Sequence, residues 1–172
     1  MSWKIQLDKD WAREGFDFET VAGDDVEVSA SERFSIETAL VVVLTYVGSK
    51  VLDKLAGRVI DKGIDAAIKR LTNFARSKGK KLLLEIEDQK FDPRINLLAV
   101  KIESLEPAEF DAALDALPRL RVEATDLVDN ITEDVADVWY VWQDNKWTFT
   151  NLTTKDGEVI EELPPKQRSE KT

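Results

Sequence analysis

The densest group of side chains that could do chemistry is an acidic run in the second half of the chain. Asp126, Asp129 and Glu133 could share one face of a helix, and carboxylate oxygens grouped in this way are the ligands that Ca²⁺ and Mg²⁺ prefer. The spacing does not match a calcium-binding loop, and acidic residues are typical of solvent-exposed helix ends. We therefore predict no metal site and no cofactor.

The residue types that are missing exclude most catalytic chemistry. The chain contains no cysteine and no histidine, which excludes thiol nucleophiles, zinc–thiolate clusters and every triad with a histidine base. It also lacks a glycine-rich phosphate loop and a nucleophile elbow. The sequence therefore predicts a protein that is not an enzyme. The lack of cysteine and of a signal-like N-terminal segment predicts a cytoplasmic location.

A second cluster consists of aromatic residues near the C-terminus. The segments 138–142 and 147–152 flank Asp144-Asn145 and predict a β-hairpin. Strand alternation places Trp139 and Val141 on one face and Tyr140 and Trp142 on the other, so both faces carry large rings. We predict a partner-binding surface made of five aromatic residues, which are Trp139, Tyr140, Trp142, Trp147 and Phe149. The alternative is that the protein itself buries both faces.

Charge is unevenly distributed along the chain. The net charge is −10, yet residues 50–81 contain ten Lys/Arg and three Asp/Glu. This segregation indicates a surface for an anionic membrane or another anion, and also an acidic surface for a partner protein. The predicted anion-binding or membrane-binding residues are Lys50, Lys54, Arg58, Lys62, Lys69 and Arg70. The strong overall acidity disfavours nucleic acid as a ligand.

The longest apolar pattern predicts a central helix over residues 35–81. The run 39–47 is apolar almost throughout, and apolar residues then recur every three or four positions up to Phe74. An unbroken helix of this length would span roughly 60 Å, so we expect a break near Gly48, Gly57 or Gly63. The apolar run is too short to cross a bilayer, although it could lie in the interface.

The remaining segments predict short strands and a second helix. We expect strands at 3–7, 82–87, 95–102 and 158–160, and a small hairpin from 16–21 and 26–28, with Trp11 as an alternative helix start. The helix begins near Pro107 and is kinked at Pro118, unless 120–124 is a strand. The predicted fold class is α+β: a long central helix, small antiparallel hairpins and a proline-kinked second helix in one domain (1–163), followed by a disordered polar tail (164–172).

Composition and pattern together favour a non-catalytic, acidic protein-binding or regulatory module that acts through oligomerisation or a partner protein. The alternative is a membrane-associated protein that docks through the Lys/Arg-rich segment 35–81 and is peripheral to the membrane, such as an accessory component of a bacterial toxin or defence system. Neither function requires a cofactor.

Overall fold

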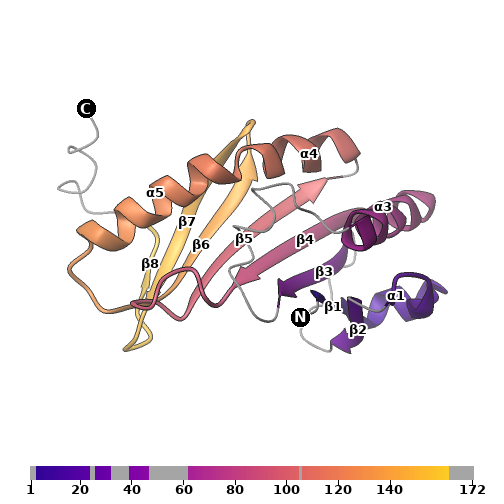
Figure 1. Cartoon of the computed structure of the whole chain (residues 1–172), viewed down its shortest axis with the longest axis horizontal. Coiled ribbons are helices and arrows are strands. Elements are labelled where there is room, and N and C mark those ends of the chain that lie inside the picture. The colour runs from indigo at the N-terminus through magenta and orange to yellow at the C-terminus, as the bar shows by residue number, and fades with distance from the viewer. Residues whose placement is uncertain (1–2, 24–25, 32–38, 47–61, 105, 163–172) are drawn as a thin grey trace.

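The computed structural model describes residues 3–23, 26–31, 39–46, 62–104 and 106–162, which form an eight-stranded mixed sheet with helices against it (Figure 1). The strands are β1 (Trp3–Asp8), β2 (Val26–Ser31), β3 (Ala39–Tyr46), β4 (Lys81–Asp88), β5 (Leu97–Ser104), β6 (Val135–Gln143), β7 (Lys146–Thr154) and β8 (Val159–Ile160). The helices are α1 (Lys9–Arg13), the 3₁₀ helix η1 (Phe18–Thr20), α3 (Lys62–Ser77), α4 (Pro107–Asp115) and α5 (Leu117–Asn130).

The strand order is β2-β1-β3-β4-β5-β6-β7-β8. The pairs β1–β2, β3–β4 and β5–β6 are parallel, and the other neighbouring pairs are antiparallel. Parallel neighbours need a crossover connection. The chain reaches β4 from β3 through α3, and it reaches β6 from β5 through α4 and α5.

The prediction of a long central helix is wrong, and with it the predicted fold class. Residues 39–46 form β3, which lies between β1 and β4 near the middle of the sheet, and within 35–81 the described helix is α3 alone. Gly48 and Gly57 lie outside the described residues, and Gly63 lies in the first turn of α3. Small separate hairpins are also absent from the described part of the chain, because its strands share one sheet.

The physical reason lies in the apolar run itself. A strand with neighbours on both edges and cover on both faces is apolar at every position, so it shows neither the period of a strand nor that of a helix. Val42 faces the main core, while Val41 and Val43 face the other way and are only 3% and 2% exposed. Their β-branched side chains favour the extended backbone.

The predicted hairpin of 16–21 with 26–28 is also wrong. β2 pairs in parallel with β1, and Phe18–Thr20 form η1. Phe16 packs on Trp11 and Phe74, with ring centroids 5.0 and 4.9 Å away. These contacts between distant segments, rather than strand alternation, determine where the aromatic side chains lie.

Several predictions that depended on local signals are confirmed. β6 and β7 form the aromatic hairpin, and both turn residues, Asp144 and Asn145, have positive φ values (53° and 58°), as a type I′ turn requires. The strands predicted at 82–87 and 95–102 largely coincide with β4 and β5, which pair antiparallel. Helices α4 and α5 meet at Ala116, just before Pro118.

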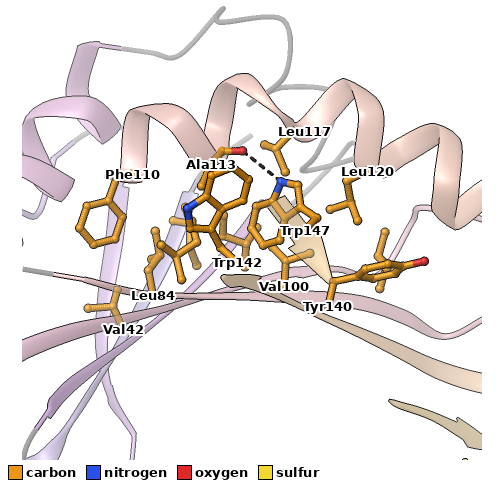
Figure 2. Close-up of a cluster of buried hydrophobic side chains, with 14 of the residues drawn as sticks. Val42, Leu84, Val100, Phe110, Ala113, Leu117, Leu120, Tyr140, Trp142 and Trp147 are labelled. Atoms are coloured by element: carbon orange, nitrogen blue, oxygen red, sulfur yellow. Dashed lines mark hydrogen bonds between the residues drawn. The ribbon is translucent and has the colours of Figure 1, made fainter. Parts of the chain in front are cut away.

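One face of the sheet carries the main hydrophobic core. Side chains from α1, α3, α4 and α5 join one cluster with Leu40, Leu84 and Val100, so these helices lie on the same face. Figure 2 shows Trp142 and Trp147 rising from the sheet toward α4 and α5. The Trp147 Nε1–H donates to the Ala113 carbonyl at 3.1 Å (Figure 2). The Trp142 Nε1 is enclosed and has no hydrogen-bond partner.

This difference between the two indoles gives a matched pair of substitutions. We expect Trp147→Phe to cost about 1 kcal/mol more than Trp142→Phe in free energy of unfolding, because only Trp147 loses a hydrogen bond. Both changes remove the same ring atoms from the core, so the packing losses are similar. Urea denaturation of the two variants measures the difference, and equal losses would contradict it.

Candidate functional site

The face of the sheet opposite the main core, here called the second face, carries the candidate site. Over β5 to β7 it presents the half-buried side chains of Lys101, Trp139, Val141 and Asn151. Toward β3 and β4 the second face is covered, since Val43 and Glu85 are each only 2% exposed, whereas over β6 and β7 its side chains are half-buried. A set of half-buried polar and aromatic side chains on such a face is typical of a binding surface.

A β-bulge in β7 shapes the site. The β6–β7 register shifts between Trp139, which pairs with Asn151, and Tyr140, which pairs with Phe149, so Thr150 is the extra residue. A bulge can place two successive side chains on the face where regular alternation allows one. Thr150 and Asn151 line a hollow of about 220 Å³ together with Trp139 and Lys101. We call these four residues the bulge site.

Lys101 is held between an aromatic ring and a carboxylate. Its Nζ lies 4.8 Å from the centroid of the Trp139 ring and 4.0 Å from Oε1 of Glu85, which is buried (2% exposed). The register explains this arrangement, because Lys101 is directly opposite Glu85 on β4 and Ala99 is beside Trp139 on β6. A cation over a ring and beside a carboxylate is attracted by both. The bulge site therefore offers a ring face, an ammonium, a hydroxyl and an amide, which are groups for binding.

The structure separates the five aromatic residues that the sequence analysis grouped together. Tyr140, Trp142 and Trp147 are buried in the main core, and Phe149 is partly buried against it with its ring 5.9 Å from that of Tyr140. Burial raises the pKa of the Tyr140 phenol. Trp139 alone of the five lies on the second face, as strand alternation predicts.

The six basic residues predicted to bind an anion or a membrane lie in different parts of the chain. Lys50, Lys54 and Arg58 lie outside the described residues. Lys62 begins α3. Lys69 and Arg70 are exposed on α3, where the Arg70 guanidinium donates to the carbonyl of Thr20.

The acidic run does not form a metal site in the described part of the chain. Glu133 lies beyond the end of α5, and Asp129 accepts a hydrogen bond from the Arg94 guanidinium at 2.7 Å. Asp92 binds the same guanidinium through both of its oxygens at 2.9 Å. These two carboxylates raise the pKa of Arg94, and together the three residues fasten the β4–β5 loop to α5. No group of three or more potential ligands converges among the described residues.

Thr148, two residues before the bulge, has an enclosed hydroxyl with no hydrogen-bond partner. We expect Thr148→Val to raise the free energy of unfolding by about 1 kcal/mol, because the substitution removes a desolvated polar group and keeps the β-branched shape. Thr154→Val is the matched control. Its hydroxyl accepts from the Glu158 N–H at 3.0 Å, so that substitution should be destabilising. Thermal unfolding of both variants tests the opposite signs.

Sequence reasoning missed Lys101, Thr150 and Asn151 as members of a site. The parallel pairing of β5 with β6 and the bulge in β7 bring them to Trp139. Neither feature has a local sequence signal.

None of the described helices is both long enough and apolar enough to cross a membrane. No protein-family model, curated protein or solved structure was found to match this chain.

Proposed function

We propose that the protein is a non-catalytic binding module that recognises a partner protein through the second face over β5 to β7. The observation that carries this proposal is the position of Trp139, a large ring turned away from the main core and beside a hollow of about 220 Å³. Interfaces commonly depend on a tryptophan anchor surrounded by polar groups that exclude water. Lys101, Thr150 and Asn151 supply such groups around Trp139.

The test compares Trp139→Ala with Val122→Ala, each used as bait for affinity purification from the native cell. Val122 is a suitable control because it is an apolar residue of α5 that is 60% exposed. Truncation of an anchor residue costs at least about 2 kcal/mol of binding free energy, or roughly 30-fold in affinity. We expect partners recovered with the wild-type protein to be lost with Trp139→Ala and kept with Val122→Ala. Equal recovery with both variants would contradict the proposal.

A second candidate function, electrostatic docking to an anionic membrane surface, is favoured by the exposed side of α3 and the turn after it. Lys69, Arg70, Arg76 and Lys78 are all exposed there. Each basic residue near an anionic bilayer contributes about 1 kcal/mol. The apolar residues 39–46, which the sequence analysis placed in the same helix as this segment, form β3. Membrane docking would therefore depend on charge alone. We expect the wild-type protein to float with anionic liposomes at low salt and the double variant Lys69→Glu/Arg76→Glu to lose this flotation. A wild-type protein that stays unbound at low salt would exclude membrane docking.

A further inference from the structure

Among the described residues, nothing pairs with the outer edge of β7 along its first half. β7 runs from Lys146 to Thr154, and β8 pairs only with Leu152 and Thr153. No other described strand lies beside β7 on this side, because β7 is next to last in the sheet. The stretch from Lys146 to Thr150 therefore presents one row of backbone groups to solvent or to a further strand.

The turn determines which backbone groups point outward. Gln143 pairs with Lys146 across the two-residue turn, and such a pair exchanges both of its hydrogen bonds. Antiparallel pairs alternate, so Thr148 also bonds toward β6, while Trp147 and Phe149 turn their N–H and C=O groups away from it. Two donors and two acceptors at this spacing match the ladder of one added strand.

The bulge site lies directly beside this open edge. Thr150 and Asn151 belong to β7, and they line the hollow with Trp139 and Lys101. Alternate side chains of a strand next to β7 would project on the second face, within reach of that hollow. An open backbone edge beside a side-chain pocket is the arrangement by which proteins recognise extended peptides.

Charge distinguishes the two candidate occupants of this edge, which are a second copy of the chain and a basic segment of a partner protein. The protein has a net charge of −10, and residues 106–134, which include α4 and α5 on the main-core face, contain nine Asp/Glu and two Arg. A second copy added at this edge would bring two such acidic helix pairs to the same side of one joined sheet, where they would repel each other. A basic segment would be attracted instead.

We propose that β7 accepts an extended basic segment of a partner protein as an added strand, with an uncharged side chain in the hollow beside Lys101 and the alternate, basic side chains on the face that carries α4 and α5. This inference rests on the proposed function, since it names the kind of partner that the second face recognises. The backbone hydrogen bonds of the added strand, however, do not depend on Trp139.

The experiment follows backbone amide and tryptophan indole signals by NMR while a synthetic peptide is added up to about 1 mM, a range that detects weak complexes. The probe is a peptide of alternating valine and lysine, and its control alternates valine and glutamate. We expect the amides of Trp147 and Phe149 to shift and to exchange with solvent at least about fivefold more slowly with the lysine peptide. The amide of Thr148, already bonded to β6, should keep its exchange rate. The glutamate peptide should bind at least about fivefold more weakly.

Three results would overturn the inference. Unchanged exchange at Trp147 and Phe149 with both peptides would exclude strand addition. Protection of these amides in the free protein, with a molar mass that doubles at high concentration, would identify a second copy as the occupant. Shifts confined to the Trp139 indole would preserve the proposed function and exclude the added strand. Conversely, protection that persists in Trp139→Ala would support the added strand and count against the Trp139 anchor.

Discussion

Replacement of Trp11 by alanine is expected to lower the free energy of unfolding by about 3–5 kcal/mol, the range for deleting a large buried aromatic side chain. The Trp11 ring is fully buried and packs against Phe16 and Phe74, at centroid distances of 5.0 and 5.8 Å. Its Nε1–H donates to the Val41 carbonyl at 2.9 Å. One side chain thus holds α1, α3 and β3 together. For a protein of this size, the melting temperature should fall by about 10 °C.

Two further variants keep this prediction testable if Trp11→Ala fails to fold. Trp11→Phe retains most of the packing and removes the hydrogen bond to Val41, so it should cost less than the alanine change. Val122→Ala changes an exposed side chain and should alter stability by no more than about 0.5 kcal/mol. Urea denaturation compares the three. A loss at Trp11→Ala no larger than at Val122→Ala would show that the aromatic contacts do not stabilise the fold.

Replacement of Asp8 by alanine is expected to cost about 1–2 kcal/mol, the range for loss of a helix cap. Asp8 is buried at the end of β1. Its Oδ1 accepts from the Asp10 N–H at 3.1 Å, which caps α1, and its Oδ2 accepts from the Val41 N–H at 3.3 Å. The carboxylate therefore joins the first helix to the start of β3. Urea denaturation near neutral pH measures the loss.

The pH dependence of Asp8→Asn provides a separate test. Burial raises the pKa of Asp8 above its ordinary value of 3.8, and this outweighs the hydrogen bond from Val41, which lowers it. The protonated carboxyl is thus favoured by folding, and its stabilising contribution is complete below the ordinary value and is lost as pH rises through the raised pKa. Asparagine cannot ionise. Relative to the wild type, Asp8→Asn should become more stable as pH rises from acid to neutral, and a constant difference would contradict this.

Local signals in the sequence were sufficient to predict the elements whose boundaries depend on neighbouring residues. Asp144-Asn145 can adopt the backbone of a type I′ turn, and Pro118 cannot continue the hydrogen bonding of a helix, so both boundaries are visible in the sequence. The run at 39–46 carries no such signal. Its placement depends on β1 and β4, which pair with it from distant parts of the chain.

The candidate site could be predicted only in part. Alternation along β6 separates Trp139 from Tyr140 and Trp142, which the structure shows. The partners of Trp139 come from β5 and β7, and their positions depend on strand register. Register is a property of the assembled sheet, and a shift by one residue would place Lys101 on the other face.

The composition of β3 also affects what happens to chains that have not finished folding. Ala39–Leu44 contains no charged residue, proline or glycine, and uncharged β-prone segments of this length assemble into amyloid-like stacks when they are exposed. In the native protein β1 and β4 occupy both edges of this strand. Any lesion that loosens those edges, such as loss of Trp11 or Asp8, should therefore lead to insoluble aggregates during synthesis rather than to soluble unfolded chains.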